Sequence, residues 1–276
     1  MKIGFIGIGN MGGAIIKGFI QSGRVEAENI FVSNRTPERM QDFVKETNVQ
    51  ACRSNKEVVE KAEIVFLAVK PKDFPEILSE LQPAFQPGKS ILVSIAAGMT
   101  LEQLEQYTNE AADMSIIRVM PNLGSLIGEG MTAVAGNEAA SQDDVSLVLN
   151  LLALIGEAIE LPEEQFSIFS AIAGCSPAFT FTYIDALARA AVRHGLNKET
   201  ATRIASQAVL GSAKTVLESG ISPMNLADQV ASPGGTTIEG VLTLADTGFV
   251  SAVVQAVDAS YKKDIEMIQR SSENPR

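Results

Sequence analysis

The feature that most constrains the fold is a glycine-rich turn close to the N-terminus, Gly7-Ile8-Gly9-Asn10-Met11-Gly12. It follows a short apolar run at residues 2–6 and precedes an amphipathic stretch at 11–20 that ends before Gly23. A GxGxxG turn between a strand and a helix is typical of a dinucleotide-binding βαβ unit, because glycine allows the tight turn and a close diphosphate. We therefore predict that the helix start holds a dinucleotide, through Gly7, Gly9, Asn10, Met11 and Gly12. A glycine-rich turn without a ligand is the alternative.

The rest of the first half repeats this alternation of strand and helix. Short β-branched or apolar runs recur at 30–33, 50–52, 64–69, 90–95 and 116–119, with two more at 132–135 and 158–161. After about Pro162 such runs stop, and small apolar residues recur at helical spacing through 166–193, 198–219 and 249–268. The pattern predicts an α/β chain: an N-terminal Rossmann-type, doubly wound, mostly parallel sheet over 1–162, then an all-helical domain over 163–276. So much apolar helix suits burial against a second subunit, so we expect the helical domain to mediate dimerisation.

The residues after the second strand indicate which dinucleotide binds. NAD-specific sites usually carry a carboxylate there for the ribose 2′-hydroxyl, whereas this chain has Ser33-Asn34-Arg35-Thr36. A guanidinium beside hydroxyl and amide groups suits a 2′-phosphate, since arginine forms charge-assisted bonds to phosphate. We predict that Ser33, Asn34 and Arg35 favour NADPH, with NADH still accepted. The alternative is a solvated Arg35 at the start of the next helix.

Two further strand ends complete the predicted cofactor site. In an open α/β sheet, the ligand crevice lies at the carboxyl ends of the strands. Ala68-Val69-Lys70-Pro71 follows the fourth strand, and Ala96-Ala97 follows the fifth. The small side chains of Ala96 and Ala97, after the fifth strand, would let a flat nicotinamide ring approach. For Lys70 the residues leave two roles open, a contact with the cofactor or a solvated turn.

One stretch of the helical half stands out, Ser232-Pro233-Gly234-Gly235-Thr236-Thr237. It leads into an apolar helical pattern and so predicts a helix N-terminus. Backbone N–H groups at such an end bind a small carboxylate, and the threonine hydroxyls can donate to a substrate atom nearby. A helix cap without a ligand is the alternative.

Several motifs together resemble one enzyme family over essentially the whole chain. They are GFIGIGNMGGAI at the N-terminus, VKP, SIAAG, RVMPN at 118–122, GEGMTA at 128–133 and DQVASPGGTTIEG at 228–240. The last is the most specific, because many dehydrogenases share GxGxxG. On these motifs the chain resembles pyrroline-5-carboxylate reductase.

The resemblance implies NAD(P)H-dependent reduction of 1-pyrroline-5-carboxylate, a small cyclic imine carboxylate, to L-proline, the last step of proline biosynthesis. It implies that Thr237 hydrogen-bonds the imine nitrogen and can relay its proton. It also implies that Gly235, Thr236 and Thr237 hold the substrate carboxylate, and that Asn122 and Ser176 bind substrate. The family further implies an interlocked helical dimer that completes each active site, and rings of such dimers.

The chain departs from the family's pattern at two places, which keeps two other functions open. Leu123-Gly124 stands where Thr-Pro is common. The common Gly-Ser-Gly-Pro-Ala-Tyr is Gly174-Cys175-Ser176-Pro177-Ala178-Phe179 here, so Cys175, Ser176 and Phe179 replace a serine, a glycine and a tyrosine. One alternative is a non-catalytic NADPH-binding regulator with the same fold. The other is a β-hydroxyacid dehydrogenase-like enzyme, which would need an acid/base lysine in the interdomain helix. The sequence has no lysine between Lys89 and Lys198.

Composition excludes several other classes. The 276-residue chain has a net charge of −11, which opposes binding to nucleic acid or an anionic membrane. Five glycines within the first 13 residues argue against a signal peptide. The uncharged stretch 166–184 is nearly long enough to span a membrane, but Gly174-Cys175-Ser176-Pro177 interrupts it, so we expect a buried helix start instead. Two distant cysteines and a single histidine, His194, indicate no metal site, no disulfide framework and a cytoplasmic location. We expect His194 on a helix surface near its C-terminal end.

Overall fold

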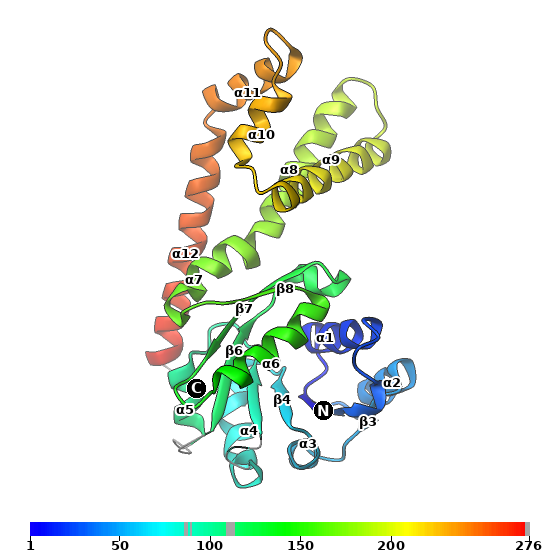
Figure 1. The fold of residues 1–276 in the computed structure, drawn as a ribbon, viewed down its shortest axis with the longest axis vertical. Helices are drawn as coiled ribbons and strands as arrows, with labels where there is room; N and C mark the ends of the chain where they lie inside the picture. The colour runs from blue at the N-terminus through cyan, green and yellow to red at the C-terminus, as the bar shows by residue number, and fades with distance from the viewer. Residues whose placement is uncertain (86–87, 89, 109–113, 274–276) are drawn as a thin grey trace. The chain divides into compact units, whose positions relative to one another are not determined.

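The computed structural model describes residues 1–85, 88, 90–108 and 114–273. Its contacts divide the chain into two compact units, Met1–Gly174 with Tyr261–Arg276, and Cys175–Ser260 (Figure 1). The first unit is thus assembled from both ends of the chain. The boundary predicted after residue 162 lies inside the first unit, which by its contacts also includes residues 163–174 and 261–276 of the predicted helical domain.

An eight-stranded sheet forms the centre of the first unit, with the strand order β3-β2-β1-β4-β5-β6-β7-β8. All neighbouring strands pair in parallel except β6 and β7. This confirms the predicted doubly wound, mostly parallel sheet. The strands are β1 (Ile3–Ile6), β2 (Ile30–Ser33), β3 (Gln50–Ala51), β4 (Ile64–Leu67), β5 (Ile91–Ser94), β6 (Ser115–Met120), β7 (Gly130–Gly136) and β8 (Gly156–Glu160).

Helices cover both faces of this sheet. Side chains of β1, β2 and β4 pack with α1 and α6 on one face, and the opposite sides of the central strands pack with α3, α4, α5 and α7 on the other. Phe5 and Phe66 stack with ring centroids 4.7 Å apart, and Phe19 meets both rings edge-on. The helices of this unit are α1 (Asn10–Gln21), α2 (Pro37–Thr47), α3 (Asn55–Lys61), α4 (Phe74–Leu81), α5 (Leu101–Tyr107), α6 (Gln142–Leu152) and α7 (Phe166–Phe169).

Shorter helical turns connect these elements. Two of them matter for the site, the 3-10 turn η4 (Leu123–Ile127) after β6 and the turn η6 (Glu163–Gln165) before α7. A π-helix, η7 (Ser170–Cys175), follows α7 directly and leads into α8. The remaining turns are Ala27–Asn29, Pro71–Asp73 (η2), Gln82–Ala84 and Ala153–Ile155.

The strand register places four loops at one edge of the sheet. Ile6, the last residue of β1, lies opposite both Ser33 and Leu67, and Leu67 lies opposite Ser94. The loops after β1, β2, β4 and β5 therefore begin side by side. Between β1 and β4 the strand order reverses direction, and ligands bind at such a switch point in open α/β sheets.

The second unit is helical, as predicted. Its helices are α8 (Ser176–Arg193), α9 (Lys198–Ser219), α10 (Pro223–Val230), α11 (Thr236–Asp246) and the first part of α12 (Phe249–Glu273). The helices α8 and α9 are joined by Asp185, which pairs with both Arg189 and Lys198. His194 is exposed and caps the C-terminal end of α8, as expected.

The expected burial of the uncharged stretch is only partly correct. Phe166, Phe169 and Ala173 are buried, but Ala188 is the only buried residue of α8. The expectation fails for residues 176–184 of α8, none of which is buried within this single chain. By length and composition alone, Glu163–Arg193 could cross a membrane. A single helix of this kind is weak support for a membrane protein.

Candidate functional site

The glycine-rich turn has the geometry that a diphosphate needs. Gly7 has φ +94°, and a Cβ atom there would lie 2.7 Å from the carbonyl oxygen of Ala68. Only glycine fits this close approach of the turn to the loop after β4. Gly9 begins α1 without a side-chain cap, and the first turn carries no acidic residue. The free N–H groups at this helix start therefore fit an anionic diphosphate. Asn10, Met11 and Gly12 form the first turn of α1.

Of the three cofactor residues predicted at the end of β2, Ser33 and Asn34 make hydrogen bonds within the protein, and Arg35 is exposed. Ser33 is buried, and its hydroxyl donates to Oδ1 of Asn55 at 2.7 Å. Oδ1 of Asn34 accepts from the backbone N–H of Ile8 at 3.3 Å, which ties this loop to the glycine-rich turn. The Arg35 side chain is 86% exposed, with Nη1 4.0 Å from a carboxylate oxygen of Asp73. Arg35 is thus the member of the set whose charge is available to a 2′-phosphate.

The other cofactor predictions lie along the same edge of the sheet. Ala68 and Val69 follow β4 and are half-buried, whereas Lys70 and Pro71 are exposed at the start of η2. After β5, Ala96 is buried and Ala97 is exposed, so one small side chain faces the core and the next is open. The structure brings all the predicted cofactor residues to the loops at the carboxyl ends of β1, β2, β4 and β5.

Asn122, predicted to bind substrate, has its side-chain amide engaged within the first unit. Its Oδ1 accepts the backbone N–H groups of Gly124 at 3.1 Å and Met131 at 3.0 Å. Its Nδ2 donates to the carbonyl oxygen of Ala173 in the π-helix at 3.0 Å. The amide thus joins the loop after β6, the start of β7 and the π-helix.

The first departure from the family's pattern belongs to this network. Gly124 supplies an N–H group to Asn122 that a proline could not supply. A Cβ atom on Gly124 would lie 2.2 Å from the carbonyl oxygen of Glu129, so this loop requires glycine. The η4 turn is therefore closed differently from a Thr-Pro turn, and Leu123 beside it is exposed. Phe179, the other departure, lies half-buried in α8.

Our interpretation of the sequence missed a nearly buried ion pair next to this network. Nη1 of Arg118 in β6 lies 2.7 Å from Oε1 of Glu163, and the Arg118 side chain is 2% exposed. The same carboxylate oxygen accepts the backbone N–H of Leu101, the first residue of α5. The Phe166 ring lies 4.6 Å from the guanidinium carbon, and Nε and Nη2 of Arg118 have no partner among the described residues. An arginine inside an apolar strand was the available signal.

The remaining predicted residues lie in the second unit. Ser176 is the first residue of α8 and is half-buried. Gly235 precedes α11 without capping it by a side chain, and Thr236 and Thr237 are the first two residues of that helix. Thr237 is half-buried, and its hydroxyl has no hydrogen-bond partner in the described part of the chain. The N–H group of Gly235 donates to the carbonyl oxygen of Ser232 at 3.0 Å, so at this helix start the N–H groups of Thr236 and Thr237 are the ones that can face an anion.

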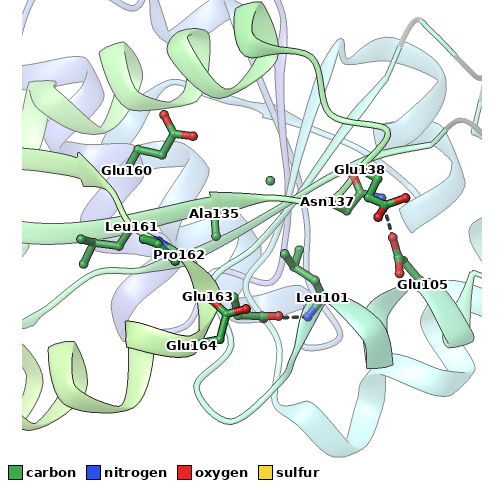
Figure 2. A pocket seen from close by; sticks show the side chains of 11 residues that line it. Leu101, Glu105, Ala135, Asn137, Glu138, Glu160, Leu161, Pro162, Glu163 and Glu164 are labelled. Atoms are coloured by element: carbon green, nitrogen blue, oxygen red, sulfur yellow. Dashed lines mark hydrogen bonds between the residues drawn. The ribbon is translucent and has the colours of Figure 1, made fainter.

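A cavity of about 910 Å³ lies elsewhere in the first unit, between α5, β7 and the segment after β8. Figure 2 shows glutamates around it, with Glu163 turned toward the backbone of Leu101 and Glu105 bonded to Asn137. None of the predicted cofactor or substrate residues lines it. Its carboxylates would repel a phosphate or a substrate carboxylate, so we do not assign the cofactor or substrate to it. Those carboxylates belong to Glu105, Glu138, Glu160, Glu163 and Glu164.

The two cysteines lie far apart in the chain and differ in burial. Cys52 is buried, and burial is the main reason that the pKa of its thiol is raised above the usual value. Cys175 ends the π-helix and is half-buried. Among the described residues, no group of three or more His, Cys, Asp or Glu side chains could hold a metal ion.

Family models match both halves of the chain. The model described as pyrroline-5-carboxylate reductase dimerisation matches residues 163–267, which include the long apolar helical run. The model described as NADP oxidoreductase, coenzyme F420-dependent, matches residues 2–98, the part that carries the glycine-rich turn.

Whole-chain comparisons agree with these matches. Pyrroline-5-carboxylate reductase of Escherichia coli is 42% identical over 262 residues, covering 95% of this chain and 96% of the relative. A pyrroline-5-carboxylate reductase structure from Coxiella burnetii superposes with a TM-score of 0.91 at 31% identity, covering 96% of this chain and 98% of the other. The Plasmodium falciparum pyrroline carboxylate reductase, solved with NADP bound, gives a TM-score of 0.83 at 30% identity, covering 97% and 98%.

Proposed function

This chain belongs to the pyrroline-5-carboxylate reductase family, and on that premise we propose which of its residues carry out the reaction. The protein is an NADP-dependent oxidoreductase that reduces the imine of 1-pyrroline-5-carboxylate to L-proline, the last step of proline biosynthesis. Its relatives with this activity in their names come from bacteria, an archaeon and mammals. The proposals below concern the positions in this chain.

The first unit holds the cofactor. N–H groups at the start of α1, from Gly9 to Gly12, bind the diphosphate, and Arg35 binds the 2′-phosphate. Lys70, Ala96 and Ala97 border the nicotinamide end, where small side chains allow the ring to approach. The bound nucleotide supplies the hydride that reduces the imine carbon. Support comes from the strand register, which starts these loops along one edge of the sheet.

The start of α11 holds the substrate. N–H groups of Thr236 and Thr237 bind the substrate carboxylate, next to Gly235, whose own N–H donates to the Ser232 carbonyl. The Thr237 hydroxyl hydrogen-bonds the ring nitrogen and relays to it a proton that it regains from water. One observation carries this assignment: an eleven-residue helix that begins uncapped, with a half-buried hydroxyl that has no partner in the described part of the chain. Ser176 contributes a further polar group from the start of α8. Such a reaction depends mainly on orienting two rings and needs no strong acid residue.

The working form is a homodimer built by the helical unit, and rings of dimers are the larger assembly. Support comes from the match to a dimerisation family model and from exposed apolar side chains on every helix of this unit. They include Phe181 on α8, Leu210 on α9, Val230 on α10, Leu242 on α11 and Val250 on α12. We place the protein in the cytoplasm, which its two free cysteines suit.

The test is turnover by the purified full-length protein. NADPH oxidation is followed with 1-pyrroline-5-carboxylate, then with NADH and with the six-membered cyclic imine. Fast formation of proline, with NADPH preferred, is the expected result. NADPH binding without turnover of either imine would instead identify a non-catalytic regulator and would direct attention to Leu123, Gly124 and Phe179.

A further inference from the structure

We propose that Asn122 is a positioning residue: its amide clamps the π-helix Ser170–Cys175 and thereby fixes the turn from which α8 starts. The inference rests on the proposed function for its catalytic consequence only. The resemblance implied that Asn122 binds substrate. In the structure its side chain is hydrogen-bonded to three backbone groups of this chain instead, so we assign it a positioning role.

The π-helix needs an outside donor. In an α-helix the Ala173 carbonyl would accept the N–H group of residue 177, but residue 177 is a proline and has no N–H. Ala173 is buried, and a buried carbonyl without a hydrogen bond is costly. Nδ2 of Asn122 supplies the missing donor at 3.0 Å.

The orientation of the Asn122 amide is fixed by its other end. Oδ1 accepts two backbone N–H groups, from Gly124 in η4 and from Met131 in β7. With the acceptor oxygen occupied by two donors, the amide nitrogen has to face Ala173. A side chain held in this way at three points has little freedom to leave for a ligand.

The Asn122 clamp is one of three contacts that attach the segment between β8 and α8 to the rest of the first unit. Arg118 of β6 holds Glu163 at the start of this segment, and Asn122, just after β6, holds Ala173 near its end. Oγ of Ser170 lies 3.3 Å from Oδ1 of Asp264 in α12, which holds the first residue of the π-helix. All of these contacts lie within the first unit.

The position of the clamp in the chain gives it a role in the reaction. The proposed cofactor residues precede the π-helix, whereas Ser176 and the start of α11 follow it. Loosening the π-helix should therefore disturb the placement of the substrate groups and leave cofactor binding intact. Single π-turns inside helices occur frequently at functional sites.

The variant Asn122→Asp tests the clamp with little change of shape. Aspartate keeps an oxygen for the N–H groups of Gly124 and Met131, but it turns an oxygen instead of an N–H toward the Ala173 carbonyl. We expect kcat to fall about tenfold, the factor that corresponds to one lost hydrogen bond, with the KM for NADPH within about twofold of wild type. Unchanged kcat would overturn the proposal.

A second readout does not depend on activity. Cys175 is the last residue of the π-helix and is half-buried, whereas Cys52 is 3% exposed. Alkylation of the native full-length protein by iodoacetamide, resolved by mass spectrometry, should be about tenfold faster at Cys175 in Asn122→Asp and unchanged at Cys52. Equal acceleration at both cysteines, or at neither, would contradict a local clamp. If wild type turned over neither imine, the proposed function would fail while this measurement still decided the clamp.

Asn137 provides a matched control. Its Oδ1 accepts the N–H groups of Ile116 and Ala140, and its Nδ2 donates to the carbonyl of Met114, so its amide closes a loop away from the π-helix. Nδ2 also donates to the Glu105 carboxylate, so Asn137→Asp adds a carboxylate repulsion and is the more disruptive of the two changes. Asn137→Asp should lower stability without selective labelling of Cys175 or a selective loss of kcat. If both variants behaved alike, the effect would be general destabilisation and the proposal would be wrong.

A separate variant covers the case in which Asn122→Asp does not fold. Ser170→Ala removes only the hydroxyl that contacts Asp264 and leaves every bond of Asn122 in place. It should also label faster at Cys175 than at Cys52, by a smaller factor. Labelling of Cys175 about tenfold or more above wild type in Ser170→Ala, although every bond of Asn122 remains, would show that Asn122 does not hold the π-helix and would overturn the proposal.

Discussion

Arg35 is an exposed charge beside the loop that follows β2, and it is the residue on which cofactor preference should depend. Arg35→Ala should raise the KM for NADPH by about tenfold to a hundredfold, because a charge-assisted hydrogen bond to phosphate contributes roughly 1.5–3 kcal/mol. The KM for NADH should change little, since NADH has no 2′-phosphate. Steady-state kinetics with both cofactors measure the difference.

Arg24 serves as the control for Arg35. It is exposed in the same unit, just beyond the C-terminal end of α1, away from the edge where the cofactor loops begin. Arg24→Ala removes the same charge and should leave both KM values unchanged. Equal rises for NADPH and NADH in Arg35→Ala would remove that residue from phosphate binding.

Thr237 should affect turnover rather than cofactor affinity. Thr237→Ala removes the hydroxyl proposed to hold the imine nitrogen, so kcat should fall about a hundredfold, the lower range for proton transfer by a positioned group. NADPH affinity, measured by fluorescence titration, should remain. On the same helix the Thr243 hydroxyl donates to the Glu239 carbonyl and is exposed, so Thr243→Ala should keep wild-type turnover. Wild-type kcat in Thr237→Ala would exclude that hydroxyl from the mechanism.

At the scale of elements, the pair of Arg118 and Glu163 attaches η6 to β6 and α5. Glu163→Ala leaves a guanidinium that is 2% exposed without its counterion, so the free energy of unfolding should fall by about 3 kcal/mol. Urea unfolding measures the change. Glu164→Ala removes the same charge from the neighbouring exposed position and should stay within about 0.5 kcal/mol of wild type. Similar losses in both variants would argue against a specific role for the pair.

The helical hairpin of α8 and α9 should weaken in acid. Hydrogen bonds from Lys198 and then Arg189 lower the pKa of Asp185. A lowered folded pKa stabilises the folded state above the unfolded value of about 3.9, and this contribution is lost as the pH falls through the folded pKa. Asp185→Asn should therefore be less stable than wild type at neutral pH, with the gap closing below about pH 4.

Thermal unfolding across pH measures this gap. Asp258→Asn on α12 removes a carboxylate at an exposed position and provides the comparison. A gap between Asp185→Asn and wild type that stayed constant down to strongly acid pH would show that the ion pairs of Asp185 are not its cause.

The strands could be predicted from the sequence because buried parallel strands are continuous apolar runs, such as Ile64–Leu67. The positions of the cofactor loops could be predicted as well, because each loop begins where an apolar run ends. The π-helix could not be predicted, because one wider turn hardly alters the apolar periodicity of 166–193, and its support by Asn122 comes from a distant part of the chain. A motif identified Asn122 as a candidate, but only the fold shows that both ends of its amide are occupied.

At the scale of the whole molecule, the exposed apolar helices predict the assembly. Val250 on α12 is 69% exposed, and Val250→Glu would place a charge in the proposed dimer interface. We expect the variant to have the mass of a single chain in light scattering and to lose turnover. Leu147→Glu adds the same charge to an exposed apolar position of α6 in the first unit and should leave the mass unchanged. A dimeric Val250→Glu protein with wild-type turnover would place the interface elsewhere.

The return of the last helix to the first unit has a consequence for synthesis. Residues from Tyr261 onward belong to the same compact unit as the glycine-rich turn. During synthesis, the N-terminal strands leave the ribosome long before the end of α12. The first unit can therefore complete its fold only after residues from Tyr261 onward have been made. A premature stop codon before position 261 would therefore damage the nucleotide-binding body as well as the helices it truncates.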